Sequence, residues 1–363
     1  MSLYANRGFY LPKNVRQMNF LDRNEFNFSP STKVLEAIKN FDPNKLCFYT
    51  RIYDEGKKSI VSVFLSELYG VDEKQVLLGY GGEDILKNTV HYFLSEADGN
   101  KTMLVPEYSW WYYNSIADEV DGTTYKYPLY ETETSFKYDL QEVVAKVNEV
   151  KPKILLLASP NNPTGNGLTP DEVDWLMEHI PSNVIVLIDE AYASFVVVDN
   201  SYIAKLVNKH SNLIISRTLS KFYGLPGLRM GFGFIGKNQE KFLKCANKYL
   251  GYNRFAEEVA IAALQSDEHY RNVAQQMKAG CELYAKELGS LPGFKVYDSV
   301  ANFILINYPI ELKPALQKAM ADQDYKIKFM NEPGIDKHLR ITLGRPEQNK
   351  IVCETIKKIA LGK

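Results

Sequence analysis

Cysteine is scarce in this sequence, with four residues among 363. Cys47, Cys245, Cys281 and Cys353 stand far apart and form no CxxC pair, which argues against a zinc site. A chain of this length does not need disulfide bonds, so four separate thiols indicate a reducing compartment. The sequence therefore predicts no bound metal and a cytoplasmic location.

Excess charge of one sign and long apolar runs are also missing. The 43 Lys and Arg residues balance 44 Asp and Glu residues, and the basic residues are scattered along the chain. This composition argues against the concentrated positive field of a nucleic-acid-binding protein. The longest apolar runs are far too short to cross a membrane, and the N-terminal segment lacks a signal-peptide pattern. We expect neither a nucleic-acid partner nor a membrane segment.

The middle of the chain alternates strand-like and helix-like segments. Continuous apolar runs such as ILLLA (154–158) and VIVLI (184–188) are typical of strands buried on both faces of a parallel sheet. Strands are expected at residues 75–78, 102–105, 123–127, 153–158, 184–188 and 213–216. Helices are expected between them, for example at 85–94 and 170–180. The alternation predicts an α/β domain built from βαβ units.

The C-terminal part of the sequence has a different pattern. Helical patterns at 237–264 and 270–288 precede short strand-like pieces and a closing helix at 346–359, which indicates a smaller α+β domain. The chain is long enough for two domains. We predict an N-terminal arm (1–44) that contributes to the small domain, a large cofactor-binding domain (45–250) and a small C-terminal domain (251–363).

Polar and glycine-rich clusters follow several of the predicted strands. In a doubly wound sheet, ligands bind at the carboxyl ends of the strands. The clusters are GYGGED (79–84), PEYSWW (106–111), SPNNPTG (159–165), DEAY (189–192) and RTLSKFYGLPGLRMG (217–231). Each cluster alone has an ordinary explanation as a turn, a helix cap, core aromatics or a surface lysine. Their combination at successive strand ends indicates one shared crevice.

The residue types in these clusters suit pyridoxal phosphate. Lys221 can form a Schiff base with an aldehyde, and Asp189 can keep a pyridine nitrogen protonated. Asn162 and Tyr192 can contact the ring hydroxyl, and Tyr108 can stack on the ring.

A phosphate has its own candidate binding groups. Backbone N–H groups around residues 81–83 lie at the expected start of a helix, where anions bind well. The hydroxyls of Thr218 and Ser220 and the guanidinium of Arg229 can add hydrogen bonds to the same group. The sequence therefore predicts that Lys221 holds a cofactor aldehyde while its neighbours hold the phosphate.

The motifs SPNNPTG, DEAY and TLSKxxxLxGLRxG, in this order, resemble those of class I/II aminotransferases of fold type I. The sequence is most similar to histidinol-phosphate aminotransferases, from residues 21–31 to residues 338–349. The resemblance implies a large domain with a mostly parallel central sheet flanked by helices, plus a smaller α+β domain. It also implies pyridoxal-phosphate-dependent transamination between an amino acid or amino-alkyl phosphate and a 2-oxo acid.

The resemblance also implies roles for individual residues. Lys221 is the expected catalytic lysine, and Arg340 resembles an arginine that binds the anionic group of the substrate. The implied cofactor-binding residues are Gly82, Glu83, Tyr108, Asn162, Asp189, Tyr192, Thr218, Ser220 and Arg229. Tyr53 resembles a tyrosine that reaches the phosphate from the neighbouring subunit, which implies a homodimer with shared active sites.

Departures from the family pattern concern the expected substrate site. Asn24 is retained there, but Phe28 replaces a tyrosine that contacts substrate, and Lys328 stands where an arginine is usual. Arg254 occupies a position where small or polar residues are common. These differences led us to hypothesise a substrate other than histidinol phosphate, such as an aromatic or acidic amino acid.

Transamination has three competing explanations in this sequence. A decarboxylase of the threonine-phosphate type uses the same fold and cofactor, and the sequence leaves that alternative open. A DNA-binding regulator with an aminotransferase-like domain is disfavoured, because the resemblance starts near residue 20 and the charge is balanced. A nicotinamide dehydrogenase is disfavoured because GYGGED lacks the G-x-G-x-x-G spacing and Lys221 would have no role.

Overall fold

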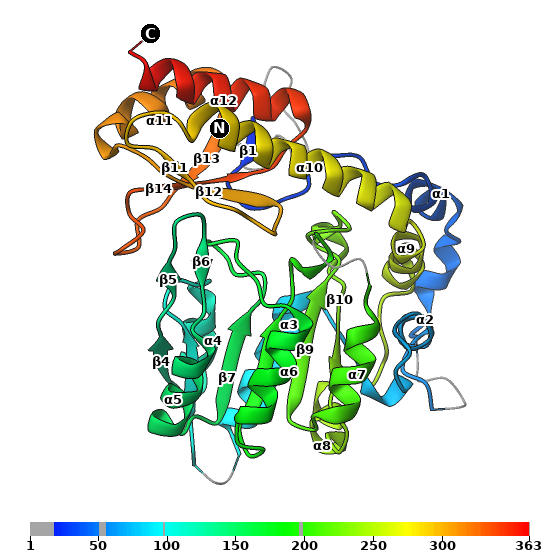
Figure 1. The fold of residues 1–363 in the computed structure, drawn as a ribbon. Helices are drawn as coiled ribbons and strands as arrows, with labels where there is room; N and C mark the ends of the chain where they lie inside the picture. The colour runs from blue at the N-terminus through cyan, green and yellow to red at the C-terminus, as the bar shows by residue number, and fades with distance from the viewer. Residues whose placement is uncertain (1–17, 51–55, 97–98, 196–198, 363) are drawn as a thin grey trace.

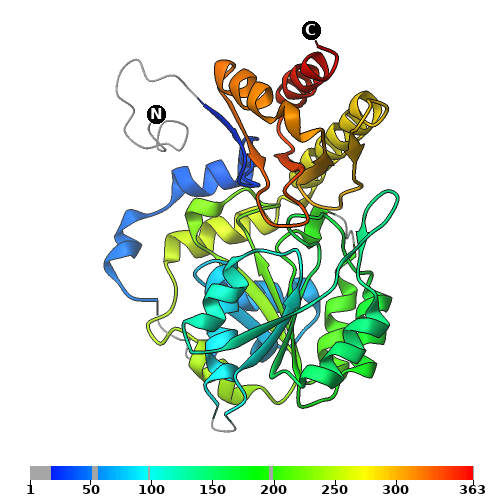
Figure 2. The same cartoon turned by 90° about the vertical axis from the view of Figure 1, so that its left-hand side faces the viewer.

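The computed structural model describes residues 18–50, 56–96, 99–195 and 199–362. Figure 1 shows a larger part, built on a central sheet with helices on both sides, and a smaller part above it that contains the C-terminus. The described segment nearest the N-terminus lies beside the smaller part, as Figure 2 shows. Both parts contribute to the cavity described below.

The larger part is built on a seven-stranded sheet with the order β2-β10-β9-β8-β7-β3-β4. Its strands are β2 (Val76–Gly79), β3 (Thr102–Pro106), β4 (Thr123–Tyr127), β7 (Ile154–Ala158), β8 (Ile185–Asp189), β9 (Leu213–Thr218) and β10 (Gly231–Ile235). All run parallel except β10, which is antiparallel to both of its neighbours. The sheet is therefore mostly parallel, and each of the six predicted strands is present.

The strand β10 was not predicted, because its sequence GFGFI alternates glycine with phenylalanine. Glycine weakens a strand unless another backbone approaches closely. Here a Cβ atom on Gly233 would lie 2.3 Å from the carbonyl oxygen of Ile215 on the adjacent strand. Tight packing between β9 and β10 therefore explains the glycine, and local sequence preference did not reveal the strand.

Helices cover both faces of this sheet. They are α2 (Ile60–Tyr69), α3 (Gly82–Leu94), α4 (Tyr112–Asp118), α5 (Leu140–Val150), α6 (Pro170–His179), α7 (Ser201–Lys209), α8 (Glu240–Ala246) and α9 (Arg254–Leu264). A short hairpin of β5 (Tyr130–Glu131) and β6 (Phe136–Lys137) adds to this part. Short 3-10 helices lie at Pro43–Cys47, Glu73–Gln75, Ala193–Phe195, Pro226–Leu228 and Ile310–Leu312.

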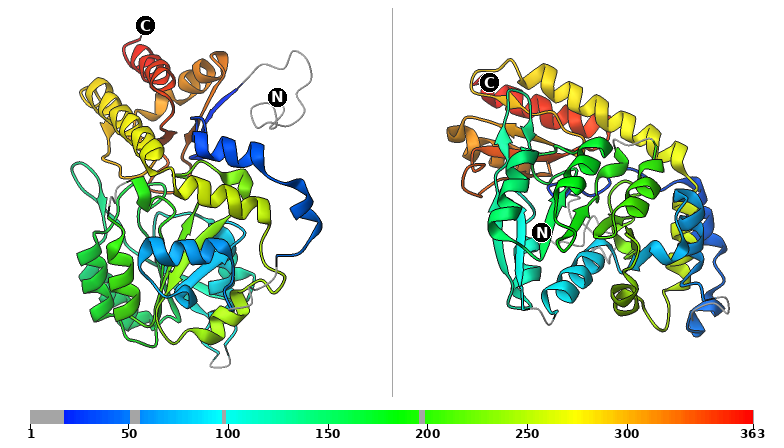
Figure 3. Two further views of the ribbon diagram at one scale, coloured as in Figure 1. Left: turned by 90° about the vertical axis from the view of Figure 1, so that its right-hand side faces the viewer. Right: turned by 60° about the horizontal axis from the view of Figure 1, so that its bottom comes forward.

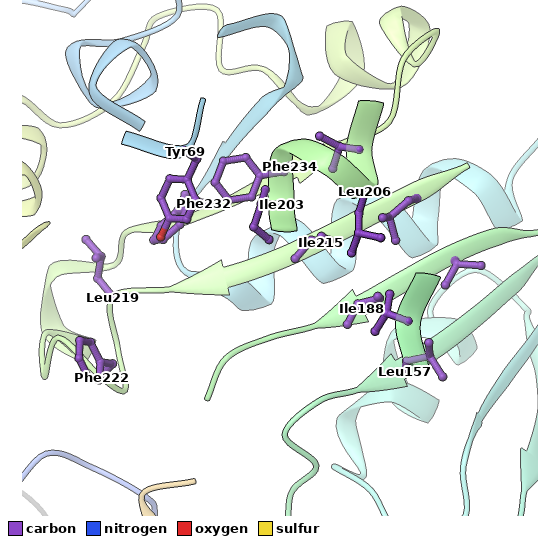
Figure 4. Close-up of a cluster of buried hydrophobic side chains, with 14 of the residues drawn as sticks. Tyr69, Leu157, Ile188, Ile203, Leu206, Ile215, Leu219, Phe222, Phe232 and Phe234 are labelled. Carbon is purple, nitrogen blue, oxygen red and sulfur yellow. The ribbon is translucent and has the colours of Figure 1, made fainter. Parts of the chain in front are cut away.

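The continuous apolar strands divide their side chains between two cores. From β7, Leu155 and Leu157 join the core that also contains side chains of α5, α6 and α7, whereas Ile154 and Leu156 join the core with α3, α4 and α8. Figure 4 shows Ile188 and Leu157 of the first core together with side chains of α7. Burial on both faces is the reason that these strands lack polar alternation.

The smaller part contains a five-stranded sheet with the order β1-β13-β14-β12-β11. Its strands are β1 (Asn19–Leu21), β11 (Lys295–Val296), β12 (Phe303–Asn307), β13 (Tyr325–Phe329) and β14 (His338–Thr342). Its helices are α10 (Asp267–Leu288), α11 (Lys313–Asp322) and α12 (Pro346–Ala360). Because β1 pairs in parallel with β13, a segment from the start of the chain completes a C-terminal sheet. The exact division into domains stays a prediction.

The helical stretch expected at 237–264 is two helices, so that prediction was wrong. α8 ends at Ala246 and α9 starts at Arg254, with Asn253 as the N-cap of α9. Between them Gly251 has φ +80°, and a Cβ atom there would lie 1.6 Å from the carbonyl oxygen of Thr50. The close approach of residue 50 breaks the helix, and the helical periodicity of the sequence does not reveal that contact. Figure 3 shows α9 beside α1 (Thr32–Asn40), which it contacts.

The described part of the chain lacks two classes of feature. No helix there combines the length and apolar character needed to span a membrane. Within the same residues, no group of three His, Cys, Asp or Glu side chains is arranged to hold a metal ion. Cys47, Cys245, Cys281 and Cys353 are all free thiols.

Candidate active site

A cavity of about 850 Å³ lies where the carboxyl ends of the central strands face the smaller sheet. Most of the predicted site residues line it, although they come from distant parts of the chain. These residues are Asn24, Gly82, Glu83, Asn162, Asp189, Tyr192, Thr218, Ser220, Lys221, Arg229, Lys328 and Arg340. The cavity is thus the shared crevice that the strand-end clusters predicted.

Lys221 lies in the loop that follows β9. Its Nζ atom donates to the carbonyl oxygens of Arg23 and Asn24, each at 3.3 Å. The same atom is 5.7 Å from the centre of the Tyr192 ring. Two backbone carbonyl groups therefore position the Lys221 amine inside the cavity. From there the amine can reach a bound aldehyde.

Asp189 is the last residue of β8, and only 8% of it is exposed. Its Oδ2 atom accepts from the Tyr113 hydroxyl at 2.7 Å, and its Oδ1 atom accepts from the backbone N–H of Ala191 at 3.0 Å. Burial raises the pKa of Asp189, while these two hydrogen bonds and the charge of Lys221 oppose that rise. A basic nitrogen entering the cavity would stabilise the charged carboxylate.

Burial of the Asp189 carboxylate has a free-energy cost in the cofactor-free protein. Because folding raises the pKa of Asp189, this residue stabilises the folded protein fully below its unfolded pKa of about 4. That contribution is lost as pH rises through the pKa of the folded state. We expect Asp189→Asn to raise the unfolding midpoint of the cofactor-free protein by a few degrees at about pH 8, and by less at about pH 4. Thermal unfolding of both proteins at the two pH values checks this. A variant that is less stable at the higher pH contradicts it.

A cluster of donors suited to an anion lies at the start of α3. Gly82 is the first residue of this helix, and its backbone N–H group is free of intrahelical partners, as in any first turn. Thr218 donates to the Ser220 hydroxyl at 2.9 Å, and both line the cavity. Arg229 donates from Nη2 to the carbonyl of Tyr80 at 3.1 Å, which holds its guanidinium beside the same helix.

Gly81 allows this close approach. Its φ of +88° is unfavourable for a residue with a side chain, and a Cβ atom would lie 2.5 Å from Nη2 of Arg229. The glycine in the GYGGED cluster is therefore needed both for the turn and for the position of the arginine.

Arg340 projects from β14 and is buried. Nη2 donates to the carbonyl of Asp22 at 2.7 Å, and Nη1 donates to Oδ1 of Asn162. Its Nε has no hydrogen-bond partner among the described residues. Burial lowers the pKa of Arg340, although Tyr192, Asp22 and Glu332 oppose the shift. A buried guanidinium with a free donor is well placed to bind an anion.

Lys328 lies directly opposite Arg340, because β13 and β14 pair with these two residues in register. Both line the cavity, so the smaller sheet presents two cationic groups to it.

The segment from the start of the chain also enters the cavity. Asn24 has φ 56° and donates from Nδ2 to the Tyr192 hydroxyl at 3.0 Å. Its backbone N–H donates to Oγ1 of Thr342, and its carbonyl accepts from Nδ2 of Asn302. This residue therefore joins Tyr192 of the larger part to β14 of the smaller one.

Some predicted residues lie elsewhere. The Tyr108 ring packs edge-on against Phe136, with 6.3 Å between ring centres, and it is not among the cavity-lining residues. Phe28 packs against Phe26 and the core of the smaller part, and Arg254 begins α9; neither lines the cavity. Tyr53 lies outside the described residues.

Other residues line the cavity without having been predicted, among them Arg23, Trp110, Tyr113 and Glu332. The aromatic run at 108–113 marked the right region, but it did not show which rings face inward. That choice depends on where α4 starts, which is at Tyr112.

Comparison with known proteins places the chain in a family. The family model described as aminotransferase class I and II matches residues 16–356. The chain belongs to this family. The enzyme is accordingly a pyridoxal-phosphate-dependent aminotransferase, which confirms the predicted enzyme class and cofactor.

Several curated relatives are similar along most of their length. Histidinol-phosphate aminotransferase 1 of Mannheimia succiniciproducens is 29% identical over 339 residues, covering 93% of this chain and 88% of the relative. Histidinol-phosphate aminotransferase of Roseiflexus castenholzii is 30% identical over 349 residues, covering 95% and 91%.

Solved structures share the fold of this aminotransferase. Histidinol-phosphate aminotransferase from Sinorhizobium meliloti, in complex with pyridoxal-5'-phosphate, has a TM-score of 0.83 and 20% identity, covering 96% of this chain and 92% of that one. L-threonine-O-3-phosphate decarboxylase from Porphyromonas gingivalis has a TM-score of 0.78 and 20% identity, covering 95% and 99%. The predicted fold type I architecture is confirmed.

The cavity of this aminotransferase fits pyridoxal phosphate chemically. The cofactor carries a phosphate, an aldehyde and a basic ring nitrogen. The cavity offers a helix N-terminus with hydroxyls and Arg229, the amine of Lys221, and the buried carboxylate of Asp189. A Cβ atom on Gly81 would clash with Arg229. The glycine therefore lets Arg229 lie beside the other phosphate-binding groups.

Proposed function

We propose that this enzyme transfers the amino group of an amino-alkyl phosphate of the histidinol-phosphate type to a 2-oxo acid, as a step of amino-acid biosynthesis. The observation that carries the proposal is the pair of cations on the smaller sheet. Arg340 and Lys328 are register partners on β14 and β13 and line the same cavity as Lys221. Two cationic groups on adjacent strands can bind a phosphate together.

The choice of donor follows from the positions of the departures from the family pattern. Phe28 and Arg254, which suggested a different substrate, do not line the cavity. Lys328 does line it and keeps the positive charge of the usual arginine. The names of the relatives also favour histidinol phosphate over an aromatic or acidic amino acid.

The cofactor-binding roles are proposed from the same geometry. Thr218, Ser220, Arg229 and the backbone of Gly82 and Glu83 would hold the phosphate. Asp189 would accept from the protonated ring nitrogen. Oδ1 of Asn162 is occupied by Arg340, which leaves its Nδ2 to donate to the ring oxygen, together with the Tyr192 hydroxyl. Stacking by Tyr108 stays a prediction, because Trp110, Trp111 and Tyr113 of this run line the cavity and Tyr108 does not.

Lys221 is the proposed proton carrier. When bound, pyridoxal phosphate supplies an aldehyde that carries the amino group and a ring that accepts electrons during proton transfer. The amine of Lys221 would take the proton from Cα of the donor and deliver it to the carbon of the cofactor that carried the aldehyde. The carbonyl oxygens of Arg23 and Asn24, at 3.3 Å, would orient Nζ for both transfers. Arg340 would hold the anionic end of the donor meanwhile.

A spectral titration tests this function. The holoenzyme is mixed, without any acceptor, with histidinol phosphate, histidinol, glutamate, aspartate, phenylalanine or threonine phosphate. The proposal predicts that histidinol phosphate converts the cofactor to its pyridoxamine form at a lower concentration than any other donor. Histidinol should need a concentration at least about a hundredfold higher. Equal responses to histidinol and its phosphate contradict it. Release of carbon dioxide from threonine phosphate would favour the decarboxylase.

A homodimer with shared active sites belongs to the same proposal. Phe48, Tyr49 and Tyr249 are 72%, 67% and 84% exposed, which is unusual for side chains of this size. Residues 50 and 251 approach closely, so these three aromatics lie on neighbouring segments and are the proposed dimer surface. Tyr53 follows Tyr49 by four residues in the sequence. We expect Tyr249→Glu to yield monomers in analytical ultracentrifugation and to weaken cofactor binding. Tyr125→Glu, at an exposed tyrosine on the edge strand β4, is the control, and an unchanged mass for Tyr249→Glu contradicts the dimer surface.

We also place the enzyme in the cytoplasm, which the free thiols support.

A further inference from the structure

Tyr113 lies in the first turn of α4 and has no role in the chemistry described so far. Its hydroxyl donates to Oδ2 of Asp189 at 2.7 Å. We propose that Tyr113 is a positioning residue that keeps Asp189 charged and directed toward the basic ring nitrogen of the cofactor. The inference rests on the proposed role of Asp189.

The contact between Tyr113 and Asp189 is almost completely buried. Tyr113 is 3% exposed, and its ring packs edge-on against Trp110, with 5.6 Å between ring centres. The core behind α4 includes Ile116 and Ala117 of the same helix. The hydroxyl therefore has little freedom to turn away, and it fixes the orientation of the carboxylate at the end of β8.

Neighbouring polar groups are engaged elsewhere. Glu190 accepts from Nε of Arg217 at 2.8 Å, and the Tyr138 hydroxyl donates to the carbonyl of Ala158 at 2.7 Å. The Tyr192 hydroxyl accepts from Asn24, and Lys221 donates to backbone carbonyls. Among the described residues, the side-chain donor on Asp189 is Tyr113, and the other hydrogen bond comes from the backbone of Ala191.

The effect of Tyr113 on the charge of Asp189 follows from the pKa shifts of the two residues. Burial raises the pKa of Asp189, and the hydrogen bond from Tyr113 lowers it again. Burial and the Asp189 charge raise the pKa of Tyr113 well above its ordinary value, so its hydroxyl stays protonated and remains a donor. Without this donor, the proton between the ring nitrogen and Asp189 shifts toward the carboxylate.

Tyr113→Phe removes the donor and keeps the ring. Tyr127→Phe is the matched control, because Tyr127 is also buried and donates one hydrogen bond, to the carbonyl of Leu156 at 3.0 Å. Each protein is reconstituted with pyridoxal phosphate labelled with nitrogen-15 in the ring. We expect Tyr113→Phe to weaken cofactor binding by about tenfold or more, and to move the ring-nitrogen NMR resonance toward the neutral value. Tyr127→Phe is expected to change neither.

Asp189→Asn, measured in the same way, separates this inference from the function on which it rests. A shifted resonance in Asp189→Asn, with Tyr113→Phe and Tyr127→Phe both like the parent, overturns the role of Tyr113 alone. An unshifted resonance in Asp189→Asn overturns the proposed role of Asp189 and, with it, that of Tyr113. Shifts in Asp189→Asn and Tyr113→Phe, but not in Tyr127→Phe, support the inference.

Discussion

Replacing Lys221 with alanine is expected to lower the rate of amino-group transfer by at least about a thousandfold, the largest effect of any single substitution in this enzyme. The methyl group of alanine can neither bind the cofactor aldehyde nor carry a proton. Two other cationic side chains of the cavity are held elsewhere: Arg229 at the start of α3, and Arg340 by Asn162 and Asp22. Single-turnover formation of pyridoxamine phosphate from saturating donor measures the effect.

A lysine outside the cavity is the control for this experiment. Lys205 on α7 is mostly exposed and lies 3.6 Å from Asp174 on α6, so Lys205→Ala should keep nearly the parental rate. If Lys221→Ala retained more than about a tenth of the parental rate, another base would have to move the proton, and the assignment of Lys221 would be wrong.

Arg340→Lys is expected to lower kcat/KM for the phosphate-bearing donor by about a hundredfold, the second largest effect. Lysine keeps the charge but has no planar fork, so it cannot donate to Asn162, to the Asp22 carbonyl and to the donor anion together. The Nε atom of Arg340, which has no partner among the described residues, would be lost as well. Steady-state kinetics with histidinol phosphate measure the loss, and the visible cofactor band should persist.

The comparison variant for Arg340 is Lys326→Gln. Lys326 lines the cavity but is half exposed and lies 3.5 Å from Asp22, so its loss should change kcat/KM only a few-fold. With histidinol, which lacks the phosphate, Arg340→Lys should behave much like the parent. An equal loss for histidinol and histidinol phosphate would mean that Arg340 supports the structure of the site and does not bind the donor anion.

Prediction from the sequence succeeded where a local pattern has one structural meaning. The run ILLLA predicted a strand buried on both faces, and β7 contributes alternate side chains to two cores. Thr169, Pro170 and Glu172 stand at the start of α6, where Thr169 and Glu172 form a capping box. The helix prediction at 237–264 failed because a contact with the carbonyl of Thr50 breaks it, and that contact joins segments about two hundred residues apart.

The candidate site also contains both residues that were predicted and residues that were not. Lys221, Asp189 and Asn162 were predicted because their motifs follow predicted strands, and Arg340 was predicted from the resemblance to a known family. The cavity brings all four together. Tyr113 was not predicted, because nothing in an aromatic run tells which hydroxyl will lie 2.7 Å from a carboxylate on another strand.

By itself, the sequence determined the cofactor through residue types at strand ends, and it determined the enzyme class through the resemblance of its motifs to a known family. Only the tertiary structure decided which side chains line the cavity. It put Lys328 opposite Arg340 through the register of β13 and β14, and it left Phe28 outside the cavity. The physical reason is that strand identity follows from local hydrophobic pattern, whereas side-chain direction and strand register depend on packing between segments distant in the chain.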